Sequence, residues 1–156
     1  MKSAGAKKPR LRLAAAVSRF NPEVTRGLLE GARAWLATRG IPLADSDVFE
    51  APGAFELPLL AKGLALTGRY EGVLCLGCVI KGDTAHFEFI SLAASMGIMN
   101  ASLETGVPIA FGVLTTYTDE QALARSRPGA ENKGKEAAQA CVEAAEALAR
   151  ISRKKR

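Results

Sequence analysis

A single histidine, His86, lies in the stretch VIKGDTAHFEFI, residues 79–90. An apolar run typical of a strand leads into this stretch, and a helical pattern follows it. Gly82 permits a tight turn between them, and Asp83 and Thr84 can cap the helix. A helix start attracts phosphate through its free N–H groups, and a nearby imidazole can exchange protons near neutral pH. The stretch predicts an anion site with His86 as the proton-transfer group; the alternative is a histidine that serves only packing.

The three cysteines indicate packing rather than metal or redox chemistry. Cys75 and Cys78 have C-x-x-C spacing inside the apolar run GVLCLGCVI, and in a strand they point to opposite faces. A redox pair of this kind belongs at a helix start, where the thiolate is stabilised. No second Cys/His pair completes a zinc site, and Cys141 makes the count odd. We therefore expect core cysteines and no metal.

The elements that must position these groups alternate between strand and helix. Apolar, β-leaning runs lie at residues 11–18, 46–52, 72–80 and 107–116, and helical patterns lie at residues 21–40, 54–68, 86–106 and 131–151, with a short helical turn near 119–125. Near-continuous hydrophobic strands separated by helices indicate a parallel sheet covered on both faces. We predict one α/β domain over residues 1–156, a three-layer α/β/α arrangement with a four-stranded parallel, flavodoxin-like sheet.

Three local details refine this prediction. Asn21 is a suitable N-cap for the first helix, with Pro22 at the first helical position, and Trp35 falls on the apolar face and is expected in the core. The helix over residues 86–106 is rich in small and apolar residues and is expected to be largely buried. Ligands of such sheets bind where strands end and helices begin, so the four strand-to-helix junctions should line one edge.

Composition and charge favour a cytoplasmic globular protein. The chain has 156 residues, of which 48% are hydrophobic and 24% charged, as is ordinary for one globular domain. Its apolar runs are too short to cross a bilayer, and residues 13–17 are too short for the core of a secretory signal. Ten basic residues and no acid lie in residues 1–12 and 149–156, so the net charge of +5 leaves −5 for the body. We expect basic tails at about residues 1–10 and 150–156; nucleic-acid binding is the less favoured alternative to solvated ends.

Five motifs occur in a mutually consistent order: RFNPEVTRGLLEGA, PGAFELP, GCVIKGDTAHFEFI, PIAFGVLTT and EQALAR…ENKGKEAA. On these motifs the chain closely resembles the lumazine synthase family, over about residues 11–148. The resemblance implies condensation of 5-amino-6-(D-ribitylamino)uracil with 3,4-dihydroxy-2-butanone 4-phosphate to give 6,7-dimethyl-8-ribityllumazine, the penultimate step of riboflavin biosynthesis. It also implies that no cofactor is used. Imine formation, phosphate elimination and ring closure depend on positioning and proton transfer.

The resemblance also implies a role for each site residue. The pyrimidine and its ribityl chain would contact Phe20, Ala54, Phe55, Glu56, Cys78, Val79, Ile80, Phe111 and Lys133; the phosphate would contact Asp83, Thr84 and Arg125; and His86 would be the proton donor. Three of these residues, Phe111, Arg125 and Lys133, would come from a neighbouring subunit. The alternative for the three phenylalanines is ordinary packing. The alternative for Arg125 and Lys133 is that each is a charged side chain exposed to solvent.

The resemblance further implies a ring of five subunits, in which an N-terminal segment adds a strand to the adjacent sheet. Some members stack twelve rings into an icosahedral shell. The linker SRPGAENKG has no insertion, which permits a shell, but Pro128 and Glu131 replace more flexible residues. We therefore predict a homopentamer and leave the shell of twelve pentamers open. Riboflavin synthase is a candidate partner.

Three other functions fit the same fold class. A flavodoxin-like nucleotide-binding module needs a phosphate loop after the first strand, and SRFNPE is not one. An archaeal-type riboflavin synthase, from the same superfamily, is less favoured because the AHFEFI motif indicates the condensing enzyme. A non-catalytic shell or flavin carrier is opposed by the intact set of site residues.

Overall fold

A computed structural model describes residues 10–153 of the chain, and in it four parallel strands form one sheet in the order β2-β1-β3-β4. The strands are β1 (Leu13–Ser18), β2 (Val48–Ala51), β3 (Gly72–Ile80) and β4 (Ile109–Thr116), and the helices are α1 (Pro22–Thr38), α2 (Leu57–Leu66), α3 (His86–Thr105), α4 (Asp119–Ser126) and α5 (Lys133–Arg153). Two short 3-10 turns, η1 (Asp45–Asp47) and η2 (Ala54–Glu56), flank β2. The predicted three-layer, flavodoxin-like architecture is confirmed.

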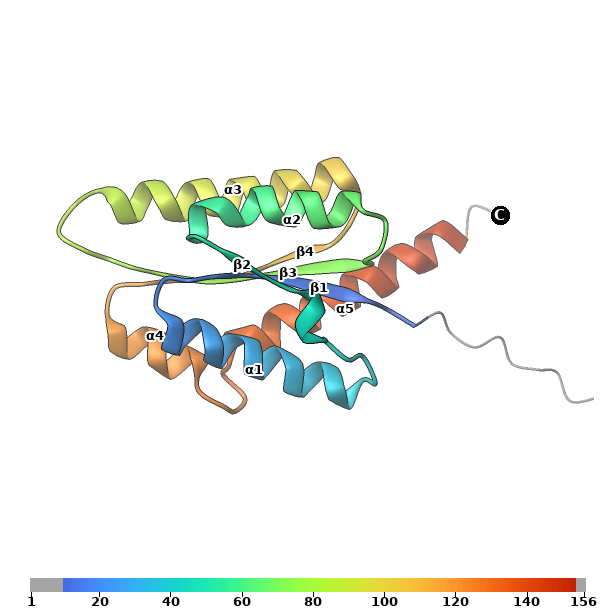
Figure 1. The fold of residues 1–156 in the computed structure, drawn as a ribbon, viewed down its shortest axis with the longest axis horizontal. Helices are drawn as coiled ribbons and strands as arrows, with labels where there is room; N and C mark the ends of the chain where they lie inside the picture. Colours follow the sequence, from blue (N-terminus) through green and yellow to red (C-terminus); the bar gives the residue numbers. More distant parts are fainter. Residues whose placement is uncertain (1–9, 154–156) are drawn as a thin grey trace, which may run out of the picture.

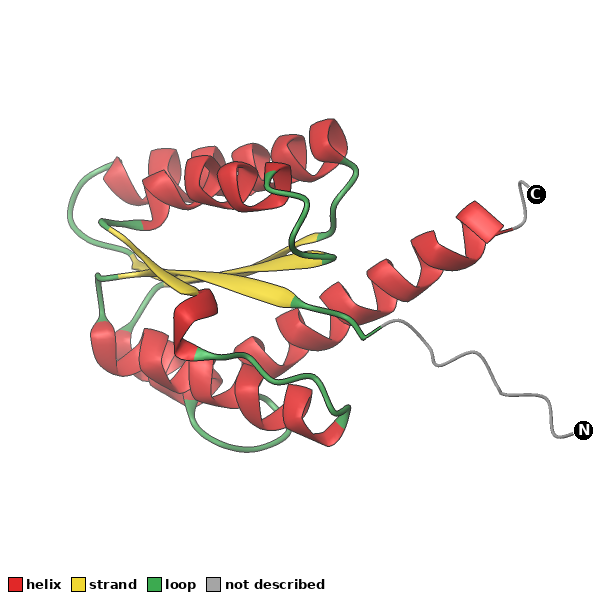
Figure 2. Ribbon diagram, turned by 45° about the vertical axis from the view of Figure 1, so that its right-hand side comes forward, coloured by secondary structure: helices red, strands yellow, loops and turns green. Residues whose placement is uncertain are grey.

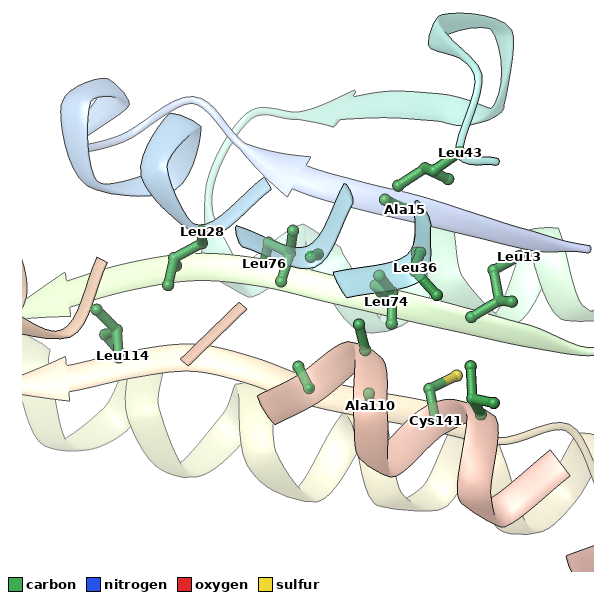
Figure 3. Packing of buried hydrophobic residues seen from close by; sticks show 14 of the residues in the cluster. Leu13, Ala15, Leu28, Leu36, Leu43, Leu74, Leu76, Ala110, Leu114 and Cys141 are labelled. Atoms are coloured by element: carbon green, nitrogen blue, oxygen red, sulfur yellow. The ribbon is translucent and has the colours of Figure 1, made fainter. Parts of the chain in front are cut away.

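Helices α2 and α3 cover one face of the sheet, and α1, α4 and α5 cover the other (Figure 1). Each face has its own apolar cluster. Leu28, Leu36, Leu74 and Leu76 belong to the cluster beneath α1 and α5, part of which Figure 3 shows. Alanines fill β1, and their small side chains let helices lie close to the sheet on both sides. Among residues 10–153, no helix combines the length and the apolar character that a membrane span needs.

The cysteines lie as the strand pattern predicted. Cys75 packs in the cluster beneath α2 and α3, whereas Cys78 and Cys141 pack in the cluster on the other face. All three are buried and free. Burial raises the pKa of Cys78 to about 11 and the pKa of Cys75 and Cys141 to about 12. The thiols therefore stay protonated near neutral pH and supply neither a nucleophile nor a metal ligand.

The carboxyl edge of the sheet is stepped. The pairing of β1 with β3 ends at Val17 and Leu76, whereas β3 continues beside β4 as far as Ile80 opposite Thr116. On the β1 side, the last residues of β3 therefore have no strand partner. These residues line a hollow at this edge, where the topology of an open α/β sheet places ligands.

The amino edge is closed by polar contacts within the chain. Arg12 donates to both carboxylate oxygens of Asp47, at 2.8 and 3.4 Å, and the Tyr70 hydroxyl donates to the same carboxylate at 2.8 Å. The Arg12 guanidinium also lies 5.1 Å from the centroid of the Tyr70 ring. Because these three residues lie one or two positions before three different strands, the contacts tie the starts of β1, β2 and β3 together. We call Arg12, Asp47 and Tyr70 the amino-edge network.

Helix α3 is not largely buried, so that expectation was wrong for the single chain. Only Ala94, Ile98 and Ala101 of this helix are buried. Large apolar side chains repeat along its outer face at alternating intervals of three and four residues: Phe89, Leu92, Met96, Met99 and Leu103. We call these five residues the α3 stripe; they do not pack in the chain's own core, and an exposed apolar face of this size is typical of an interaction surface. Trp35 is likewise only half-buried, with the Arg39 guanidinium 5.4 Å from its ring centroid.

Candidate active site

A cavity of about 500 Å³ opens at the stepped carboxyl edge of the sheet. Its walls come from the β1–α1 loop, η2, the end of β3 and the first turns of α3. The lining residues are Phe20, Asn21, Gly53, Ala54, Phe55, Glu56, Cys78, Val79, Ile80, His86 and Ile90. We call this cavity the main pocket. It gathers eight of the residues predicted from the sequence, contributed by four separate elements.

Asn21 fixes one wall of the main pocket. Its backbone is left-handed, with φ at 57°, a conformation that asparagine tolerates better than most residues. The residue stands at the predicted N-cap position of α1, but its side chain does not cap the helix. Instead, Nδ2 donates to the carbonyl oxygen of Cys78 at 3.0 Å, which bridges the step between β1 and β3. The bond holds the loop so that the neighbouring Phe20 ring stands at the pocket mouth.

Gly53 leaves room for the Phe20 ring and the Glu56 carboxylate to lie close to the same point of the main pocket. A Cβ at Gly53 would lie 3.3 Å from both the ring of Phe20 and a carboxylate oxygen of Glu56, closer than ordinary contact allows. The Phe20 and Phe55 side chains remain 67% and 59% exposed. Exposed aromatic rings around a hollow with one carboxylate suit a flat, hydrogen-bonding ligand.

The predicted phosphate loop, residues 81–85, lies beside the main pocket and is exposed along its length. The expectation that Asp83 or Thr84 caps α3 was wrong: Ala85 stands at the N-cap position and no side chain caps the helix, although the Thr84 hydroxyl accepts from the backbone N–H of His86 at 3.4 Å. Among the hydrogen bonds of residues 10–153, none involves the Asp83 side chain. An exposed helix start attracts an anion, and His86, the first residue of α3, also lines the main pocket.

Three predicted residues lie elsewhere in the subunit. Phe111, Arg125 and Lys133 line a second cavity, of about 370 Å³, along the outer strand β4. We call it the edge pocket. The Lys133 ammonium lies 2.9 Å from both carboxylate oxygens of Glu136, and the Arg125 guanidinium donates to the Gln121 carbonyl at 3.1 Å. As formed by residues 10–153, the two pockets have no lining residue in common.

Comparison with known proteins decides between the enzyme and the other functions that fit this fold. The family model of 6,7-dimethyl-8-ribityllumazine synthase matches residues 10–149. The chain belongs to the 6,7-dimethyl-8-ribityllumazine synthase family. Its activity is accordingly the lumazine synthase reaction of riboflavin biosynthesis.

Individual lumazine synthases align over nearly the whole chain. The chain is 66% identical to 6,7-dimethyl-8-ribityllumazine synthase 1 of Caulobacter vibrioides, over 90% of this chain and 92% of the relative. It is 54% identical to the Syntrophus aciditrophicus enzyme, over 87% of this chain and 88% of the relative. Identity to the Deinococcus radiodurans enzyme is 49%, over 92% of both chains.

Sequence reasoning missed three lining residues of the main pocket and most of those of the edge pocket. Asn21, Gly53 and Ile90 line the main pocket, and Glu136 lines the edge pocket. Asn21 and Gly53 stand next to predicted residues and carried a signal, since each breaks the local pattern at a strand-to-helix junction. Glu136 follows Lys133 by one helical turn, which is ordinary ion-pair spacing and points to no pocket. No group of three His, Cys, Asp or Glu side chains within residues 10–153 is placed to hold a metal ion.

Proposed function

We propose that the main pocket of one subunit binds the pyrimidine substrate and that the edge pocket of a neighbouring subunit completes the lumazine synthase site. The observation that carries this proposal is the separation of the predicted residues into two pockets within one chain. Each pocket alone is too poorly equipped for the reaction, because the first lacks the Arg125 guanidinium and the second lacks the imidazole. A ring of identical subunits would bring the two together around the circle.

The pyrimidine would lie against the Phe20 ring, with Ala54 and Phe55 forming the wall behind it. Backbone groups at Cys78, Val79 and Ile80 would read its polar edge where β3 extends beyond its pairing with β1; the Cys78 carbonyl, which already accepts from Asn21, has a second lone pair to offer. The Glu56 carboxylate, held near Gly53, would accept hydrogen bonds from the ribityl hydroxyls. From the neighbour, Phe111 would cover the ring and Lys133 would reach the pyrimidine; both line the edge pocket.

The phosphate of the second substrate would lie at the start of α3. Thr84 and the first residues of α3 are exposed there, and the helix dipole favours an anion. Asp83 would contribute through its backbone, since its own carboxylate repels phosphate. The neighbour's Arg125 would provide the opposing positive charge with a bidentate contact.

His86 would move protons during the reaction. The amine of the pyrimidine attacks the ketone of the butanone phosphate, and loss of the former carbonyl oxygen as water leaves an imine. A proton from His86 to the departing oxygen would assist that step, and the neutral imidazole could then accept a proton as phosphate leaves. Its exposed position at the pocket edge supports exchange with solvent between turnovers.

The proposed assembly is a homopentamer, with the shell of twelve pentamers left open. Support comes from the α3 stripe, whose spacing suits packing against copies of the same helix. The predicted N-terminal pairing strand lies largely outside the described residues, as do most of the basic tail residues. We place the enzyme in the cytoplasm, with riboflavin synthase as the partner that takes up its product.

Mixing two inactive variants tests the shared site directly. A His86→Ala subunit keeps a sound edge pocket, and an Arg125→Ala subunit keeps a sound main pocket. Co-refolded rings should therefore contain intact sites in roughly a quarter of positions by random assortment. The activity of the mixed rings should rise well above that of either single variant, when it is measured at a butanone phosphate concentration at which Arg125→Ala is nearly inactive. If the mixture only averages the two parents, the site lies within one subunit and the proposal fails.

A further inference from the structure

Asn132 is the last residue of the linker between α4 and α5, and it is 1% exposed. Buried polar side chains need partners, and this one has several. Its Nδ2 donates to the carbonyl oxygens of Ser126 at 2.9 Å, of Arg127 at 3.1 Å and of Gly27 at 3.1 Å. Its Oδ1 accepts from the Lys135 N–H at 3.0 Å, which makes it the N-cap of α5. One side chain therefore ties together the end of α4, the start of α5 and the middle of α1.

Glycines shape the α1 surface against which this junction rests. A Cβ at Gly31 would overlap the Asn132 side chain, and a Cβ at Gly27 would overlap the Ser126 carbonyl. On the other side, a Cβ at Gly134 would overlap the Leu28 carbonyl. At Gly27 and Gly134 the nearest atoms belong to the backbone of another helix, so there is no flexible side chain to absorb a displacement. The junction is held rigidly on α1, and α1 is anchored in the larger apolar cluster.

The residues that this junction holds adjoin the charged groups of the edge pocket. Arg125 directly precedes Ser126, whose carbonyl Asn132 binds, and Lys133 directly follows Asn132. Both charged side chains line the edge pocket and are exposed or half-exposed, with no buried contact of their own to fix them. The placement of their backbones is therefore set by the asparagine behind them.

We propose that Asn132 is a positioning residue for the condensation, which fixes Arg125 and Lys133 as one unit against α1. This inference rests on the proposed function, in which those two residues complete a neighbour's site. A misplacement of about 1 Å far from the reacting atoms can cost roughly 100-fold in an enzyme. Asn132 thus acts on substrate binding through its neighbours and touches no substrate itself.

Two variants disturb the junction in different ways. Asn132→Asp keeps the size but replaces both N–H donors with an oxygen that faces three carbonyls. Gly31→Ala leaves the asparagine intact and pushes it from the α1 side. Gly63→Ala is the matched control, since this α2 glycine has open space where a Cβ would stand. Each variant is assayed as the assembled enzyme, with the two substrates varied separately and the melting temperature recorded.

We expect Asn132→Asp and Gly31→Ala to raise KM for the butanone phosphate by roughly 10–100-fold, with Gly63→Ala unchanged. A purely structural role would lower the melting temperature and the amount of active enzyme but leave KM as it was. Combining Asn132→Asp with Arg125→Ala should give little further increase over Arg125→Ala, because both changes remove the same contact.

The outcomes distinguish failure of the positioning role of Asn132 from failure of the proposed function on which it rests. If Arg125→Ala itself leaves KM for the butanone phosphate unchanged, the proposed function fails. If Arg125→Ala raises KM while both junction variants match Gly63→Ala, the positioning role is overturned and the proposed function stands. Should Asn132→Asp fail to assemble, Gly31→Ala alone decides the question.

Discussion

The side chains at the two edges of the sheet differ in how many contacts they make within the chain. At the amino edge, Asp47 is 5% exposed and bonded to Arg12 and Tyr70 from two other segments. At the carboxyl edge, Phe20, Phe55 and His86 stand exposed, and few contacts within the chain restrain them. The contrast indicates that the first edge contributes to stability and the second keeps its groups free for ligands. Substitutions should separate accordingly, into effects on unfolding and effects on turnover.

The largest effect is expected at the carboxyl edge. His86→Ala should slow turnover by roughly 100-fold, at the low end of the range for positioned acid–base groups, because the chemistry proceeds slowly without a catalyst. Binding of a lumazine analogue and the melting temperature should stay close to wild type. Full activity across neutral pH would mean that His86 is not the proton donor.

Arg125→Ala should weaken use of the butanone phosphate far more than use of the pyrimidine. Loss of a charge-assisted hydrogen bond costs about 1.5–3 kcal/mol, which corresponds to roughly a 10–150-fold rise in KM. Steady-state kinetics with each substrate varied in turn measures the split. Equal changes in both values would remove Arg125 from the phosphate site.

The amino edge should respond in stability alone. Asp47→Asn removes the charge that Arg12 and Tyr70 share, and we expect a loss of about 1–3 kcal/mol in the free energy of unfolding, with kcat unchanged. Asp45→Asn is the control, because the Asp45 side chain is 96% exposed although it also pairs with an arginine. Denaturant titration compares the two. Equal losses in the free energy of unfolding would show that burial does not determine how much the Asp47 contact stabilises the protein.

The pH dependence of stability follows from the same carboxylate. The Arg12 hydrogen bond, helped by the Tyr70 hydroxyl, lowers the pKa of Asp47 below its ordinary value. A lowered pKa in the folded state adds stability above the unfolded-state value, near 4, and that stability is lost as the pH falls further. Wild type should therefore lose more stability than Asp47→Asn as the pH falls from about 5 to about 2. Parallel acid unfolding curves would contradict this.

The smallest effect is expected for an ion pair at the other edge. Arg19 and Glu50 lie 2.7 Å apart at the carboxyl edge, but both side chains are more than half exposed. Exposed pairs contribute about 0–1 kcal/mol, so Arg19→Ala should barely move the denaturation midpoint. A loss as large as that of Asp47→Asn would end the distinction between the two edges.

Much of this architecture follows from the sequence. The apolar run at residues 72–80 coincides with β3, and Asn21–Pro22 marks the start of α1, because strand hydrophobicity and helix-start residues are local signals. Pro58 is tolerated near the start of α2 as its early place in the pattern predicted. The eight predicted residues of the main pocket were named by the resemblance to the family, and the rule that ligands collect at the carboxyl ends of parallel strands explains why they share one edge.

What sequence could not supply depends on contacts between distant segments. The Asn132 junction joins residues 105 positions apart, and no residue pattern near Gly27 indicates this contact. Asp47 and Tyr70 each look like ordinary surface residues until the register brings three strand starts together. The burial of α3 was misjudged because an apolar helix face reads the same whether its partner is the chain's own core or another molecule.

The α3 stripe makes the isolated subunit prone to aggregation. Until its five large apolar side chains are covered, they remain in water and invite contact with any newly made chain. If the stripe forms contacts in the proposed pentamer, assembly would compete with aggregation, and the outcome would depend on how many subunits are present at once. Dilution would act on such a protein much as a denaturant does, since the folded form gains stability from its partners by mass action.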